Sequence, residues 1–437
     1  MELGSWAIVQ SLPLLALIPL MIYIVLSLMG KNNTWAIILG ITAGALLNGL
    51  NLKAVSSAFA SSMSSSTALI GIIIMAGAGL GQVMTETRVT HTLVYWIVKR
   101  IGVNTQTKAK FVLVICSIII CGLLGTLGGG NAVIAPIMIP VMASLGVTPT
   151  VVAILFKISG EMGLVLGPLT GVTLITMEVT GLSYGELMLG AGIPFAIFFI
   201  GGAWIGALRA QKRTQSTERY TLSDDMQDLD KIVITKQETV TTVAFLASFL
   251  ALVTYGIITK QGTAYALTVM MILIAVVSLF ARLSADAVIG ATVKGVQSQA
   301  GMFIIFITID VLLQMVTAGG GFDALGNLLS GFSKDSPSAV MLIAAVVGGF
   351  GIEAAAVAEM FGEAARATGL PMSMFAISIL CATRLTGSTY PCSNMNGQMG
   401  IAGCTNLKEM LQGCWIAVGT VCIAVVIWAF VGVYILT

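Results

Sequence analysis

The chain has 437 residues, of which 57% are hydrophobic and only 9% are charged, and its net charge is +2. Soluble domains carry roughly 25% charged residues, so the composition excludes an ordinary soluble protein and indicates a polytopic membrane protein. The small net charge gives no reason to expect a nucleic-acid partner. The seven cysteines show neither a metal-binding spacing nor a disulfide framework.

Apolar segments that are long enough to cross a membrane follow one another along the chain. Because a bilayer offers the backbone no water, such segments must form helices or a closed barrel, and runs such as 193–208 favour helices. The run 12–28 lacks a basic n-region and a cleavage site, so we expect a retained helix rather than a signal peptide. The predicted spans are 6–28, 35–50, 67–87, 150–180, 187–208, 240–258, 264–281, 299–318, 372–403 and 410–435.

Two further apolar stretches, 111–144 and 338–368, are interrupted by glycine or by charge. We interpret each as a re-entrant hairpin, which enters and leaves the membrane on the same side. An amphipathic stretch precedes each hairpin, at 90–100 and at about 322–332. Such stretches suit helices that lie along the membrane interface, and an ordinary loop helix is the alternative.

The predicted spans 150–180 and 372–403 are too long for plain helices, and glycine, proline and polar residues at their centres predict a break in each. A hydrophilic linker, 209–239, separates two halves, 1–208 and 240–437, with five spans and one hairpin each. An odd number of spans inverts the second half relative to the first. Placing the linker in the cytoplasm leaves most of the 21 lysine and arginine residues inside and both termini outside.

The two halves also match in sequence at a constant offset of 223 residues. The same offset sets Glu161 opposite Arg384, and both lie within otherwise apolar sequence. A duplicated membrane chain with interrupted segments is typical of a transporter whose site lies at the repeat interface. The matching residues are Gly125, Gly128, Gly146, Ala153, Ile154, Pro168, Glu186 and Gly190, which recur as Gly348, Gly351, Gly369, Ala376, Ile377, Pro391, Glu409 and Gly413.

Candidate substrate-binding residues come from the first hairpin tip and from the second broken span. Glycines at 128–130 permit a sharp turn, and a helix starting at Asn131 would aim free N–H groups at an anion. Close helix packing through glycine is the alternative. Arg384 suits a carboxylate, which belongs either to Glu161 or to the substrate. The predicted substrate-binding residues are Gly129, Gly130, Asn131, Arg384, Ser388, Thr389, Ser393, Asn394 and Asn396.

Three carboxylates in predicted membrane segments, Glu161, Glu353 and Glu359, are candidates for carrying the coupling ion. A carboxylate in a membrane is costly unless it is paired, protonated or hydrated, which suits a proton carrier; a cation ligand and a static ion pair are the alternatives. Lys157 lies one turn before Glu161, so we expect a structural i, i+4 pair. We predict no cofactor beyond the coupling ion and no metal centre. His91 is the only histidine and is predicted to be interfacial, which disfavours a histidine proton relay.

The predicted architecture resembles the ion transporter superfamily. It has two inverted repeats of five spans, an amphipathic helix before each hairpin, and a broken span after each hairpin. That group includes gluconate permeases, citrate carriers, C4-dicarboxylate carriers and divalent-anion/sodium symporters. The stretches 72–82 and 126–140 resemble the gluconate and C4-dicarboxylate branches. The resemblance implies an elevator, in which hairpins and broken spans form a transport domain that slides against a scaffold domain. It also implies a homodimer in a bacterial inner membrane.

The Ser-Asn-Thr motif with which the divalent-anion symporters bind sodium and carboxylate does not occur in this sequence. Asn131 lies at one hairpin tip, and the pair Ser393-Asn394 lies in a broken span instead. We therefore prefer a proton over sodium as the coupling ion.

The sequence predicts an elevator-type secondary transporter that imports a small organic anion, such as a sugar acid or a hydroxy acid, coupled to protons or sodium. A cation/proton antiporter of the same architecture is the alternative, and it would need membrane carboxylates but no anion-binding arginine. A channel would not require a duplicated mobile domain, and a receptor would need a sensor domain. We do not expect an enzyme, because no nucleophile–base pair or metal-ligand cluster appears in the sequence.

Overall fold

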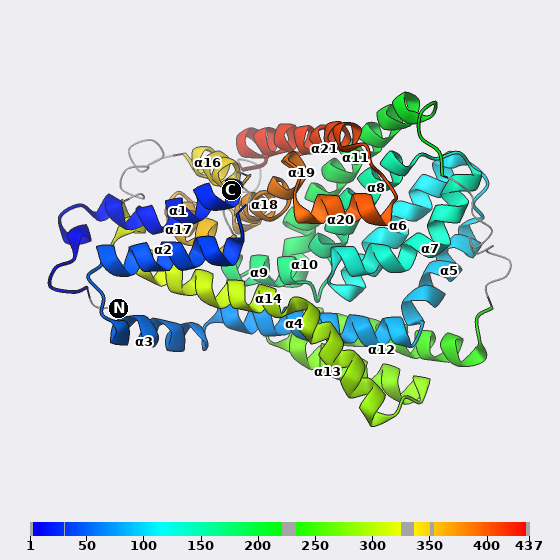
Figure 1. Ribbon diagram of the computed structural model, residues 1–437, viewed down its shortest axis with the longest axis horizontal. Coiled ribbons are helices and arrows are strands. Elements are labelled where there is room, and N and C mark those ends of the chain that lie inside the picture. The colour runs from blue at the N-terminus through cyan, green and yellow to red at the C-terminus, as the bar shows by residue number, and fades with distance from the viewer. Residues whose placement is uncertain (1–2, 30, 221–232, 325–335, 350–353, 434–437) are drawn as a thin grey trace.

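The computed structural model describes residues 3–29, 31–220, 233–324, 336–349 and 354–433. Throughout these residues the regular secondary structure is helical, without a strand (Figure 1). Eight of the described helices are long and apolar enough to cross a membrane, and shorter apolar helices accompany them. The prediction of an all-α polytopic membrane protein is therefore confirmed.

The helices follow the predicted order of segments in both halves of the chain. In the first half they are α1 (Ile18–Leu28), α2 (Asn33–Leu47), α3 (Leu52–Ser62), α4 (Ser66–Glu86), α5 (Val89–Ile101), α6 (Gln106–Leu124), α7 (Leu127–Ser144), α8 (Pro149–Leu166), α9 (Gly171–Thr180), α10 (Tyr184–Leu187) and α11 (Ile193–Thr214). In the second half they are α12 (Lys236–Ile258), α13 (Tyr265–Ala281), α14 (Ala285–Ala318), α16 (Pro337–Gly349), α17 (Ala354–Ala367), α18 (Met372–Arg384), α19 (Thr386–Thr389), α20 (Ser393–Ile401) and α21 (Leu407–Ile427).

Both predicted helix breaks are present, and they lie at equivalent positions of the two halves. Helix α8 ends at Leu166 and α9 begins at Gly171, whereas α19 ends at Thr389 and α20 begins at Ser393. Each break contains a proline, at 168 and 391, and proline both lacks the helical N–H donor and clashes with the preceding turn. The match of the repeats therefore extends from sequence to backbone conformation.

Matching glycines also pack each half against the other. A Cβ atom on Gly190 would lie 2.6 Å from Cβ of Ser373 in α18, and one on Gly413 would lie 2.3 Å from Cδ1 of Ile154 in α8. The last helical segment of the first half thus contacts α18, the first part of the broken helix in the second half. In the same way, α21 at the end of the second half contacts α8 in the first half. Helices α11 and α21 run side by side and touch where a Cβ on Gly206 would lie 2.5 Å from the carbonyl oxygen of Gly413 (Figure 1). This reciprocal packing supports two related repeats, and their inversion across the membrane stays a prediction.

Two long helices, α4 and α14, pack against each other along one side of the molecule (Figure 1). They approach so closely that a Cβ on Gly295 would lie 2.2 Å from the carbonyl oxygen of Ala78. We call α1–α4 and α12–α14 the scaffold helices. The hairpin helices, the broken helices, α10, α11 and α21 are called the core helices. Their motion relative to each other stays a prediction.

The first predicted hairpin, 111–144, consists of α6 and α7, which are joined through Gly125 in the left-handed region (φ +65°) and Thr126. Each arm is long and apolar enough to cross a membrane alone, so re-entry of this hairpin stays a prediction. The second hairpin consists of α16 and α17, and its tip at 350–353 lies outside the described residues. Most of the predicted interfacial stretch 322–332 also lies outside them, whereas 90–100 forms α5.

The bounds of two predicted spans were wrong, and one helix was missed. The segment 6–28 is not one span, because two 3-10 turns precede an 11-residue α1; prolines at 13 and 19 remove N–H donors from this stretch. Helix α14 starts at Ala285 rather than at 299, because Ser284 caps it by accepting a hydrogen bond from the N–H of Ala287. Helix α3 was missed, although Asn51 before it is a good N-cap and accepts from the N–H of Ala54 at 2.9 Å.

Candidate substrate site

A cavity of about 640 Å³ opens between the scaffold helices α4 and α14 and the core helices. Its core wall is formed by the α6–α7 tip, by α8 and α9 beside the first break, and by the ends of α18 and α20. The volume is in the range that encloses small organic ligands. Its polar or charged lining residues are Gln82, Thr85, Thr126, Ser298, Gln299, Thr383, Arg384 and Asn394.

The N-terminus of α7 faces this cavity. The helix begins at Leu127, with Thr126 as an N-cap whose side chain makes no capping bond, and the exposed Gly128 and Gly129 line the cavity. The first N–H groups of a helix have no intrahelical acceptor, and the helix dipole makes this end positive. The predicted anion-favouring helix end is therefore present. It starts four residues earlier than expected, at Leu127 instead of Asn131.

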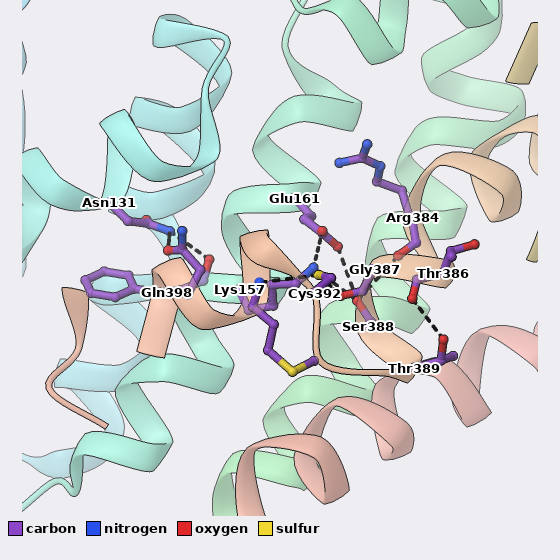
Figure 2. A network of polar contacts seen from close by, with 12 residues as sticks. Asn131, Lys157, Glu161, Arg384, Thr386, Gly387, Ser388, Thr389, Cys392 and Gln398 are labelled. Carbon is purple, nitrogen blue, oxygen red and sulfur yellow. Dashed lines mark hydrogen bonds and ion pairs between the residues drawn. The ribbon is translucent and has the colours of Figure 1, made fainter. Parts of the chain in front are cut away.

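Asn131 itself holds the hairpin in place, and its side chain is fully buried. Its Nδ2 donates to Oε1 of Gln398 in α20 at 2.6 Å (Figure 2) and to the carbonyl of Phe156 in α8 at 2.9 Å. Its Oδ1 accepts from Ser117 of α6 at 2.7 Å. The predicted contact between this side chain and a substrate does not fit the structure, because protein groups satisfy its polar atoms. Gly130 is also buried, and a Cβ there would lie 2.5 Å from Sγ of Cys121, so Gly130 serves helix packing.

Arg384 ends α18 and lines the cavity, and it is the charged residue among the described lining residues. Glu161 forms its ion pair with Lys157, and it accepts a hydrogen bond from Ser388 at 3.3 Å (Figure 2). The expected i, i+4 pair of Lys157 and Glu161 is thereby confirmed. The structure thus pairs Glu161 with Lys157 rather than with Arg384. Arg384 lies in the cavity wall, and its binding of a substrate carboxylate stays a prediction.

The remaining predicted substrate residues are divided between the cavity and the protein interior. Asn394 is exposed and lines the cavity, whereas Asn396 is exposed outside the lining. Ser388 is fully buried, and Thr389 donates its hydroxyl proton to the carbonyl of Thr386 at 2.9 Å. The side chain of Ser393 lies outside the described part. The structure therefore gathers Gly129, Arg384 and Asn394 at one cavity and places the described others away from it.

Of the three candidate coupling carboxylates, Glu353 and the side chain of Glu359 lie outside the described residues. Glu161 is buried in the pair with Lys157, away from the cavity lining. Its predicted role as an ion carrier stays a prediction.

Sequence reasoning missed the scaffold side of the cavity. Gln82 and Thr85 of α4, and Ser298 and Gln299 of α14, line it opposite Arg384. A signal existed, since these are polar side chains within or beside apolar spans, but only the α4–α14 packing shows that they face the same space. Gln398, the partner of Asn131, was missed for the same reason.

His91 lies on α5, outside the helices that qualify as membrane spans. Partial burial lowers the pKa of His91 below its ordinary value, and the charge of Arg88 adds to this effect. Arg88 also pairs with Glu238 at 3.0 Å, which ties the start of α5 to α12. The lowered pKa favours the neutral form of His91.

Residues 20–433 match the family model of the tripartite ATP-independent periplasmic transporter, DctM component. No curated protein matches the chain in a whole-sequence comparison. The matched range includes both hairpins, both broken helices and the described lining of the cavity. This family is the large membrane component of tripartite secondary transporters for organic acids, which work with a substrate-binding protein and a small membrane component. The match confirms the prediction of a transporter rather than an enzyme. It also replaces the resemblance to a wide superfamily with one family, because the chain belongs to the DctM family.

Proposed function

We propose that this chain carries a small organic anion across a bacterial inner membrane through the cavity between the scaffold helices and the core helices. The observation that carries the proposal is the meeting of two positive features at one cavity: the N-terminus of α7 at Gly128 and Gly129, and the guanidinium of Arg384. Both favour a carboxylate, one through backbone N–H groups and the other through a planar pair of donors.

The rest of the lining supports an anion over a cation. The polar residues of the described lining besides Arg384 are neutral amides and hydroxyls, which can donate to a hydroxy acid or a sugar acid. A cation/proton antiporter would need no anion-binding arginine, whereas Arg384 lines this cavity. The anion transporter is therefore favoured over the cation/proton antiporter.

The position of the cavity favours an elevator motion. Its two walls belong to different groups of helices, so sliding the core helices along α4 and α14 would carry the site with Arg384 toward either side of the membrane. The same motion must break the hydrogen bond from Thr263, just before α13, to Glu178 of α9 at 2.7 Å. We propose that a substrate-binding protein delivers the anion outside, where both termini also lie. A small membrane component would complete the scaffold.

A reconstituted system tests the proposal. The chain is placed in proteoliposomes with its small membrane component, the substrate-binding protein is added outside, and uptake of labelled organic acids is measured under an imposed proton or sodium gradient. We expect one of the two gradients to drive accumulation of at least one organic acid. Failure of both gradients with every acid tested would contradict the proposed function.

The residue test is Arg384→Gln. A hydrogen bond to a charged group contributes about 1.5–3 kcal/mol, so we expect the apparent KM for the anion to rise roughly 10- to 100-fold. Arg213→Gln is the matched control, since Arg213 is a surface arginine that pairs with Glu409 at 3.5 Å and lies away from the cavity lining. Equal effects of the two variants would count against an anion-binding role for Arg384.

A further inference from the structure

A pair of charged residues, Lys157 and Glu161, lies inside the core helices, behind the cavity wall. Lys157 is 0% exposed and Glu161 is 2% exposed, and neither lines the cavity. Isolated charges at this depth are costly, so the pair must be held by further polar contacts. Ser388 supplies them: its hydroxyl lies 3.4 Å from Nζ of Lys157 and 3.3 Å from Oε2 of Glu161 (Figure 2).

The ammonium group lies beside the second helix break. A Cβ on Gly387 of α19 would lie 3.6 Å from Nζ of Lys157 and 3.7 Å from Oε1 of Glu161, which are ordinary contact distances, so the pair lies directly against this part of α19. Helix α19 ends two residues later, and Sγ of Cys392 donates to the carbonyl of Gly387 at 3.2 Å. A carboxylate, a hydroxyl and the carbonyl end of a half-helix are the ligands that discontinuous helices offer to a monovalent cation.

The other titratable or charged groups around the pair are few among the described residues. Cys392 precedes α20, Cys414 lies on α21, and Arg384 lies on α18 one turn before Ser388. The carboxylate of Glu161 therefore relies on the ammonium of Lys157 as its direct counter-charge. The pair also joins the two halves of the chain, since α8 belongs to the first and α19 to the second.

We infer that Lys157 is a built-in cation, which occupies a site that Glu161, Ser388 and the second helix break would otherwise offer to a sodium-sized ion. The tethered ammonium fills the site permanently, so this site takes no part in ion coupling in the native chain. The inference rests on the proposed transport function only for this consequence, and the occupancy itself can be measured without transport.

Thermal unfolding of the purified protein tests the occupancy. Lys157→Ala leaves Glu161 unpaired beside an empty space, so sodium or methylammonium should raise the melting midpoint by a few degrees in a saturable manner, beyond choline at equal ionic strength. The rise in the wild type and in the double variant Lys157→Ala/Glu161→Ala should be smaller, because no ion enters this site in either of them. A rise in Lys157→Ala no larger than in both controls would overturn the inference.

A second variant covers the case in which Lys157→Ala does not fold. Lys157→Gln keeps a donor for Glu161 but leaves the site one positive charge short, so it should show the same cation-specific stabilisation. If both variants can be purified only with sodium or methylammonium present, the inference is supported. If neither can be purified under any of these conditions, it is contradicted, because an ion in solution should then replace the missing ammonium.

Uptake measurements add a readout that a purely structural pair would not change. In Lys157→Ala, the dependence of uptake on external sodium should steepen by one ion relative to the wild type. An unchanged sodium dependence in a folded, active variant contradicts the inference and leaves the proposed function standing. Absence of uptake in the wild type speaks against the proposed function, while the thermal experiment still decides the occupancy.

Discussion

The residues that the sequence predicted for the site differ in whether the structure places them at the cavity. The sequence predicted that Arg384 and Asn394 belong to the site, because polar side chains in apolar segments are unusual, and the structure places both at the cavity. It assigned Asn131 to the same task as the expected first residue of a helix after three glycines. Only the fold shows that Asn131 bonds to groups of α6, α8 and α20 instead. Residue type predicts that a polar group needs a partner, and tertiary packing decides which partner it has.

The two asparagines should therefore respond differently to mutation. Asn131→Ala leaves buried groups without partners, which costs about 1–3 kcal/mol for each group, so we expect a lower melting midpoint of the purified protein. Asn394→Ala removes an exposed amide from the cavity wall and should raise KM with little change in melting. A raised KM with native melting in Asn131→Ala would restore the original interpretation of Asn131 as a substrate ligand.

His91 gives a prediction about pH. Its pKa is lowered in the folded protein by burial and by Arg88, so the unfolded chain binds more protons in the range between the two pKa values. Stability should fall as the pH drops from 7 through the ordinary pKa of histidine, and His91→Gln should lose less stability over this range. Melting curves of both proteins between pH 7.5 and 5 provide the measurement (the interval brackets the ordinary histidine pKa of about 6.5). Parallel curves would contradict the assignment.

At the scale of elements, local sequence signals predicted the breaks within helices better than the residues at which helices begin. Pro168 and Pro391 predicted the two interruptions, because proline lacks the helical N–H donor, although α7 continues through Pro136 and Pro140. The start of α14 and the existence of α3 depended on caps at Ser284 and Asn51, whose polar neighbours resemble an ordinary loop in sequence. Whether α6 and α7 re-enter depends on the lipid boundary, which sequence length does not fix.

The α6–α7 tip offers a matched pair of glycines for a test of the helix end. A Cβ on Gly128 would meet no atom within 4 Å, whereas a Cβ on Gly129 would lie 2.6 Å from Oγ1 of Thr126. Gly129→Ala must therefore move the hydroxyl of Thr126, the N-cap residue of α7, and we expect a larger loss of uptake than in Gly128→Ala. Both variants should melt like the wild type, since both positions are exposed. An equal loss of uptake in the two would show that the N-cap geometry does not matter.

At the scale of the molecule, the repeat was the strongest sequence signal. Its constant offset predicted matching breaks, and the structure adds the reciprocal contacts of Gly190 and Gly413. The composition, repeats and motifs did not predict the tripartite system, which the family match supplies. The expected homodimer therefore competes with a different prediction, a scaffold completed by a small membrane component. The mass of the purified complex, with and without that component, distinguishes the two.

The central claim is that the anion passes between scaffold helices and core helices that move relative to each other. Gly81 of α4 and Leu124 at the end of α6 both line the cavity from opposite walls, and a Cβ on Gly81 would lie 3.5 Å from Cα of Leu124. Cross-linking the double variant Gly81→Cys/Leu124→Cys should stop uptake in proteoliposomes, reduction should restore it, and each single variant should be insensitive to the oxidant. Undiminished uptake by the cross-linked protein would contradict the account.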